Sequence, residues 1–134
     1  MSELVRFGVS IERDLLESFD DFLSERSYSN RSEAVRDLIR RVLAERAWEE
    51  GGEVAGGIVL VYDHHKRELS ERLTYIQHHA LDIIVSNMHV HLDHQSCLEV
   101  IVVRGPVERI RGLADQLQSL KGVHHCSVAE VSTS

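Results

Sequence analysis

Two histidines and a cysteine lie close together in the segment MHVHLDHQSCLEV, and their types and spacing are those of a transition-metal site. In a β-strand, residues i and i+2 point to the same face, so His89 and His91 present two imidazoles side by side. If residues 92–96 form a turn, antiparallel pairing puts Cys97 opposite His91 and Glu99 opposite His89, on one face. The spacing therefore predicts that three soft or borderline donors converge on one hairpin.

A closed four-coordinate site needs a fourth donor, and the remaining histidines are His64, His65, His78, His79, His94, His124 and His125. His78 lies near the end of a predicted helix, about 20 Å from the hairpin at ~3.3 Å per residue of strand, so within one chain it should not reach the site. A symmetric neighbour could bring its own His78 there, although this argument does not select His78 over His124 or His94.

Three imidazoles and one thiolate suit Zn(II), Cu(II) or Ni(II), and the residues alone do not decide the geometry. Glu99, opposite His89, is a candidate acceptor that orients a ligand histidine. The alternative for Glu99 is an exposed strand carboxylate.

The chain has 134 residues, a net charge of -7 and two cysteines. The acidic charge argues against indiscriminate polyanion binding, so any contact with nucleic acid must come from a local patch. No segment approaches the ~18 to 20 apolar residues of a membrane span, and no secretory signal is visible. We therefore expect a cytoplasmic protein whose cysteines stay free or bind metal.

The first 49 residues predict a strand followed by two helices. Residues 5–11 alternate apolar and polar, apolar residues then recur at helical spacing over about 12–26, and Asn30 with Glu33 resembles the capping box of a second helix that runs to about residue 48. So small a unit seldom has an independent core, and its strand has no neighbour. Antiparallel pairing with the strand of a second chain would satisfy that backbone, so we expect an obligate dimer.

Residues 50–57 are polar and glycine-rich, and we interpret them as a linker that contains a hinge. The part from 58 to 134 predicts a strand at 58–62, a helix at about 66–79, strands at about 83–92 and 97–104, a helix at about 106–119 and a strand at about 123–130. This βαββαβ order is the ferredoxin-like arrangement, also found in ACT-like domains. The predicted fold class is therefore α+β, with a βαα domain at 1–49 and a βαββαβ domain at 58–134.

With these motifs in place, the chain resembles the NikR family of nickel-responsive transcriptional regulators, which are ribbon-helix-helix proteins. The resemblance rests on residues 6–11, on YSNRSEAVRD from residue 28, on QHH from 77, on HVH from 89 and on CLEV from 97. It implies a homotetramer with two DNA-binding dimers that flank a tetrameric core of metal-binding domains. It also implies one planar Ni(II) site per subunit, formed by His89, His91 and Cys97 of one subunit and His78 of another.

The resemblance further implies nickel-dependent binding to a palindromic operator, usually with repression of genes for nickel uptake. In such proteins paired strands enter the major groove and their outward side chains read base edges. Those positions here are Arg6, Gly8 and Ser10, and Gly8 has no side chain where many relatives carry a hydroxyl group. The backbone amides at the start of the second helix, around Asn30, Arg31 and Ser32, could anchor a phosphate.

Glu33 and Asp37 lie one helical turn apart, and equivalent carboxylates in the family help to hold a hard cation such as K⁺ between the domains. A solvated acidic edge is the alternative. For the whole chain, one alternative is a ribbon-helix-helix regulator whose ferredoxin-like domain senses a small metabolite. A metalloenzyme ranks last, because four endogenous ligands close the site and no nucleophile or acid–base pair is evident.

Overall fold

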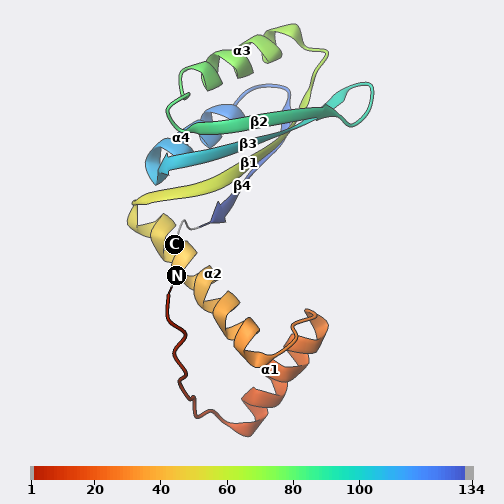
Figure 1. Ribbon diagram of the computed structural model, residues 1–134. Coiled ribbons are helices and arrows are strands. Elements are labelled where there is room, and N and C mark those ends of the chain that lie inside the picture. Colours follow the sequence, from red (N-terminus) through yellow and green to blue (C-terminus); the bar gives the residue numbers. More distant parts are fainter. Residues whose placement is uncertain (1, 132–134) are drawn as a thin grey trace. The chain divides into compact units, whose positions relative to one another are not determined.

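The computed structural model describes residues 2–131, which form four helices and four strands (Figure 1). The chain divides into two compact units, Met1–Ile39 and Arg40–Ser134. The boundary between them lies inside the second helix rather than in the glycine-rich segment. The described residues include no helix with the length and apolar character of a membrane span.

The first unit contains α1 (Arg13–Glu25) and the beginning of α2 (Arg31–Glu50). Both helices were predicted to within two residues. The Asn30 side chain caps α2 by accepting a hydrogen bond from the backbone N–H of Glu33, with Oδ1 and N 2.9 Å apart. The Glu33 carboxylate, which would form the second interaction of the expected capping box, instead accepts a hydrogen bond from Arg36 at 2.8 Å.

The strand predicted at 5–11 does not form in the single chain: residues 2–12 have neither helical nor strand structure. Every residue of this segment is exposed, including Phe7 at 70 % and Val9 at 68 %. The physical reason is that a strand needs a hydrogen-bonded neighbour, and residues 2–39 of this unit include no strand with which the segment could pair.

The second unit has the predicted element order: β1 (Glu53–Asp63), α3 (Arg67–His78), β2 (Ile84–His91), β3 (Ser96–Pro106), α4 (Val107–Gln118) and β4 (Val123–Val131). All strand pairs are antiparallel, and the order across the sheet is β2-β3-β1-β4. This is the ferredoxin-like topology, so that part of the fold prediction is confirmed.

One face of this sheet carries the core. Alternate residues of β1 and β3, such as Ile58 and Ile101, are fully buried and pack with apolar residues of α3 and α4, such as Leu73 and Leu117. The opposite face is open and apolar, with Met88 64 %, Val90 45 % and Val102 42 % exposed.

The linker predicted at 50–57 is wrong for residues 53–57, which are the first part of β1. Val54 is fully buried. At Gly56 an added Cβ would lie 2.7 Å from the Ala129 carbonyl oxygen and 3.1 Å from the Trp48 ring, so this glycine permits close packing rather than flexibility. The turn between α2 and β1 is short, with Gly51 at φ +81°.

Candidate metal centre

The hairpin of β2 and β3 has the predicted register. His91 pairs with Cys97, and His89 pairs with Glu99. Directly opposed residues of an antiparallel pair project to the same face, so the two imidazoles, the thiol and the carboxylate share one side of the hairpin.

The turn of the hairpin is held by its own polar groups. The N–H of Leu92 donates to the carbonyl oxygen of Ser96 at 2.8 Å. One carboxylate oxygen of Asp93 accepts the N–H groups of Gln95 at 2.8 Å and Ser96 at 2.7 Å. These backbone hydrogen bonds lower the pKa of Asp93, and they keep the two strand ends at a fixed separation.

The donors differ in burial. The Cys97 side chain is 1 % exposed, whereas His89 and His91 are exposed. Cys97 pairs with His91 of β2 along one edge of β3 and with Tyr62 of β1 along the other edge. Burial, together with the adjacent Cys97 thiol and Glu99 carboxyl, raises the pKa of Tyr62 well above its ordinary value. The thiol therefore reaches the site from the core side, and the imidazoles lie on the accessible edge strand.

Glu99 is buried at 4 % exposure and is hydrogen-bonded. Its Oε2 accepts from Gln77 Nε2 at 2.8 Å and from Asn87 Nδ2 at 3.2 Å. Asn87 Nδ2 also donates to Gln77 Oε1 at 2.9 Å. The alternative of an exposed carboxylate is thus wrong, and Glu99 is the centre of a hydrogen-bonded cluster with Gln77, which is buried, and Asn87, which is exposed.

Sequence reasoning missed Gln77 and Asn87. Asn87 could have been found, because it lies two residues before His89 and therefore on the same strand face. Gln77 could not, because its contact with Glu99 depends on how α3 packs against the sheet.

His64 was also underestimated, because from the sequence it was named only as one of seven remaining histidines. Its ring centroid lies 4.2 Å from that of His91 and 4.4 Å from that of His65. Its Nε2 atom is buried without a hydrogen-bond partner among the described residues. His64 therefore packs against a predicted ligand.

His78 is the last residue of α3 and is exposed. His78 and His89 line one open hollow of about 550 Å³ between α3 and β2, together with Asn87 and Glu99. Within residues 2–131 of a single chain, no three His, Cys, Asp or Glu side chains are grouped so that they could hold a metal ion. The predicted convergence of three donors is therefore not formed in the single chain: His89, His91 and Cys97 share one face of the hairpin without being grouped as ligands, and His78, at the end of α3, shares a hollow with His89 alone among them.

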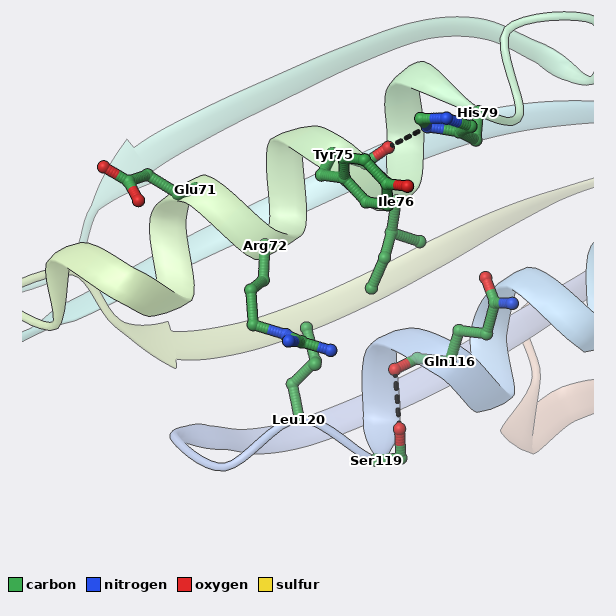
Figure 2. A pocket seen from close by; sticks show the side chains of 8 residues that line it. All are labelled: Glu71, Arg72, Tyr75, Ile76, His79, Gln116, Ser119 and Leu120. Atoms are coloured by element: carbon green, nitrogen blue, oxygen red, sulfur yellow. Dashed lines mark hydrogen bonds between the residues drawn. The ribbon is translucent and has the colours of Figure 1, made fainter.

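A second hollow, of about 760 Å³, lies between α3 and α4 and contains none of the predicted ligands (Figure 2). His79 packs against Tyr75 in its wall, with ring centroids 4.2 Å apart, and its Nδ1 donates to the Tyr75 carbonyl oxygen at 2.9 Å. His79 is thus occupied with its own helix.

The predicted nucleic-acid and cation residues all lie in the first unit. Arg6, Gly8 and Ser10 are exposed in the segment before α1. Arg31 forms two hydrogen bonds with Asp20 of α1, at 3.0 and 2.9 Å, and these lower the pKa of Asp20.

The two carboxylates predicted to hold a cation already have protein partners: Glu33 pairs with Arg36, and Asp37 accepts a hydrogen bond from Tyr28. Ser32, in the first turn of α2, is exposed.

Fold and site together define a ferredoxin-like domain whose edge hairpin carries two histidines and a cysteine on one face. Residues 55–131 match the family described as the NikR C terminal nickel binding domain. The chain therefore belongs to the NikR family.

Relatives named "Putative nickel-responsive regulator" match almost the full length. The one from Desulfovibrio desulfuricans is 52 % identical over 133 residues, covering 99 % of this chain and 96 % of the relative. That from Dictyoglomus turgidum is 54 % identical over 130 residues, covering 96 % of each. The likeness to these relatives thus extends over both units of the chain, beyond the residues that the family match covers.

Among solved structures, an uncharacterized protein from Thermotoga maritima aligns with a TM-score of 0.54 and 11 % identity, covering 58 % of this chain and 96 % of that chain. At that identity the likeness concerns the fold alone.

Proposed function

We propose that this chain is a nickel-dependent transcriptional regulator that represses genes for nickel uptake by binding a palindromic operator when Ni(II) fills its metal sites. The observation that carries the proposal is the hairpin register, which pairs His91 with Cys97 and His89 with Glu99. The regulator acts in the cytoplasm and is not an enzyme.

In this proposal each subunit contributes His89, His91 and Cys97 to one Ni(II) ion, and His78 comes from another subunit. The donor set fits the metal, since imidazole and thiolate ligands suit Ni(II) in planar geometry. Support for a site completed by a second chain is that the described residues of one chain bring no three of the candidate donors together as a ligand group. Because the thiol and imidazoles must lose protons to bind metal, nickel affinity rises with pH.

The proposed assembly is a homotetramer, a dimer of dimers. Its support is the open apolar face of the sheet, where Met88, Val90 and Val102 are exposed on the hairpin strands themselves. Apolar residues in such a patch mark an interaction surface. This face is opposite to the one that carries His89, His91 and Cys97, so its burial supports the assembly and not the placement of His78.

The proposed operator contact uses the first unit. Residues 5–11 of two chains pair antiparallel, which satisfies the backbone and buries Phe7 and Val9. The paired strands then lie in the major groove with Arg6 and Ser10 directed at base edges, while Gly8 leaves the centre of each strand without a side-chain reader.

Phosphate contact at the start of α2 is proposed for backbone amides rather than for the Arg31 guanidinium, which is engaged with Asp20. The first-turn amides at Arg31 and Ser32 point out of the helix end, and Asn30 caps only the next one, that of Glu33.

A K⁺ ion or another hard cation is proposed at Glu33 and Asp37. The support is their spacing of one helical turn, and a cation there competes with Arg36 for the Glu33 carboxylate.

The deciding experiment measures operator affinity at matched salt with and without Ni²⁺, for the wild type, Cys97→Ser and the control Cys126→Ser. Cys126 is half-buried and its thiol donates to the Ala114 carbonyl oxygen, away from the hairpin. We expect nickel to tighten operator binding in the wild type and in Cys126→Ser, and to do so weakly or not at all in Cys97→Ser. Equal operator affinity with and without nickel in the wild type would sink the proposal.

A further inference from the structure

Trp48 lies in the last turn of α2 and is 1 % exposed, although the next two residues are exposed. It belongs to the second unit. Its indole N–H donates to the carbonyl oxygen of Val131, at the end of β4, with the two atoms 2.9 Å apart. A buried indole needs such an acceptor, so this hydrogen bond fixes the orientation of the ring as well as its position.

The ring rests on β1 at Gly56. A Cβ at this glycine would lie 3.1 and 3.3 Å from two carbons of the Trp48 ring and 2.7 Å from the Ala129 carbonyl oxygen. At the next residue, Gly57, a Cβ would have no atom within 4 Å. Gly56 therefore supplies the space that the indole fills, while Gly57 does not.

Helix α4 also contacts the Trp48 indole. The guanidinium of Arg111 in α4 lies 5.7 Å from the centre of the Trp48 ring, within cation–π range. Arg111 also approaches Glu130 of β4 at 3.9 Å. β1, β4 and α4 thus surround the ring.

The turn that follows α2 is also tied to the sheet domain. Gly51 has φ +81°, and the N–H of Val107, the first residue of α4, donates to the Gly52 carbonyl oxygen at 3.1 Å. The glycine-rich segment that was interpreted as a linker is therefore hydrogen-bonded to the start of α4 at Gly52.

We propose that Trp48 anchors the C-terminal end of α2 to the sheet, so that residues 40–50 move with the metal-binding unit as one body and the Gly51–Gly52 turn does not act as a hinge. Because α2 is continuous from Arg31 to Glu50, it is the route by which a change in the metal-binding unit reaches the first unit. The anchor stands on its own contacts, and the transmission rests on the proposed function.

The first test uses intrinsic fluorescence of the full chain, because Trp48 is its only tryptophan. We expect weak quenching by acrylamide in the wild type, with the same quenching after addition of Ni²⁺ and of DNA. Gly56→Ala should displace the ring and increase quenching, whereas the matched control Gly57→Ala should behave as wild type. Strong quenching in the wild type, or quenching that changes with Ni²⁺, would overturn the anchor.

Hydrogen exchange provides a second readout. Amides of residues 42–50 should be protected in the wild type and in Gly57→Ala and should exchange faster in Gly56→Ala. If Gly56→Ala does not fold, Trp48→Phe keeps a ring but removes the N–H, and the same amides should lose part of their protection. Unchanged protection in the folded variant would contradict the anchor.

Transmission is tested by the ratio of DNA affinities with and without Ni²⁺. This ratio should fall toward one in Gly56→Ala, with the amount of bound nickel unchanged, and stay at the wild-type value in Gly57→Ala. A wild-type ratio in Gly56→Ala with an exposed Trp48 would overturn the route through α2. If the wild type binds no DNA, the proposed function fails, while quenching and exchange still decide the anchor.

Discussion

The buried carboxylate of Glu99 accepts hydrogen bonds from Gln77 and Asn87 and lies opposite His89 in the strand register. A pair of substitutions separates this packing role from the proposed role of orienting a ligand histidine. Glu99→Gln keeps a carbonyl oxygen for these donors but removes the negative charge. We expect a folded protein whose nickel affinity is lower by about 10- to 100-fold, as is usual when the partner of a metal ligand is lost. Competition with a chelator measures this affinity.

Glu99→Ala should in addition destabilise the fold, because the amide of Gln77 is left buried without its acceptor, at a cost of about 1–3 kcal/mol. Urea denaturation of the metal-free proteins measures it. Wild-type nickel affinity in Glu99→Gln would show that the carboxylate serves packing alone.

The residue-scale predictions from sequence succeeded where strand geometry decides the outcome. The pairing of His91 with Cys97 follows from a five-residue turn and the period of two, and both features can be recognised in the sequence. The contact between His64 and His91 could not be predicted, because it joins the end of β1 to the hairpin through a loop whose conformation no local pattern specifies.

The ion pair of Asp82 and Arg109 makes a pH-dependent contribution to the free energy of unfolding. Two hydrogen bonds from the guanidinium, at 2.6 and 2.8 Å, hold the pKa of Asp82 below its ordinary value. A carboxyl group with a lowered folded-state pKa contributes stability above its unfolded pKa of about 3.9, and this is lost as the pH falls through the folded value.

Asp82→Asn should therefore lower the free energy of unfolding at neutral pH and have progressively less effect below about pH 4. Since both side chains are largely exposed, the difference should be small. Urea denaturation across pH measures it, with Arg109→Gln as the partner variant. An effect of Asp82→Asn that is the same in acid and at neutral pH would point to a cause other than this ion pair.

At the scale of elements, residues 5–11 are the segment whose structure depends on a second chain. Val9→Pro removes a backbone N–H from the middle of the proposed ribbon. At about 1 kcal/mol for each lost hydrogen bond in two chains, operator affinity should fall by at least about tenfold. Nickel binding should be unchanged, because the proposed ligands are in the other unit.

The matched control is Ser2→Pro, which puts the same residue outside the proposed ribbon. Fluorescence anisotropy with labelled DNA, at one salt concentration, compares the three proteins. Wild-type affinity in Val9→Pro would mean that the ribbon does not contact DNA.

Most of the second unit was predictable because burial on one face imposes a clear period, as along β1 and β3, where buried residues alternate. Residues 53–57 were mispredicted for a specific reason: glycine indicates both flexible linkers and close packing, and composition does not distinguish the two. Only the position of Trp48 over Gly56 shows which applies.

At the scale of the whole molecule, the four proposed nickel ligands come from two elements of the chain, α3 and the β2–β3 hairpin. His78 ends α3, while His89 and Cys97 lie on the hairpin. A site shared between subunits makes nickel binding and assembly mutually dependent, so that each strengthens the other. A site within one subunit would have no such linkage.

Mixed oligomers distinguish these arrangements. His78→Ala and His89→Ala should each abolish tight nickel binding alone. The two variants are unfolded, mixed in equal amounts and refolded. In a pair with one subunit of each variant, the hairpin of the His78→Ala subunit meets the intact His78 of the His89→Ala subunit, so one of the two sites is complete. Random mixing should therefore restore about one quarter of the wild-type nickel.

His89→Ala mixed with His91→Ala is the control for this experiment. Both substitutions affect the hairpin set, so no combination of these subunits contains an intact site, and no nickel should be regained. Equilibrium dialysis against Ni²⁺ measures both mixtures. If the mixture of His78→Ala and His89→Ala also regains nothing, His78 does not act across the interface, and the link between nickel and assembly must be sought in the apolar face of the sheet instead.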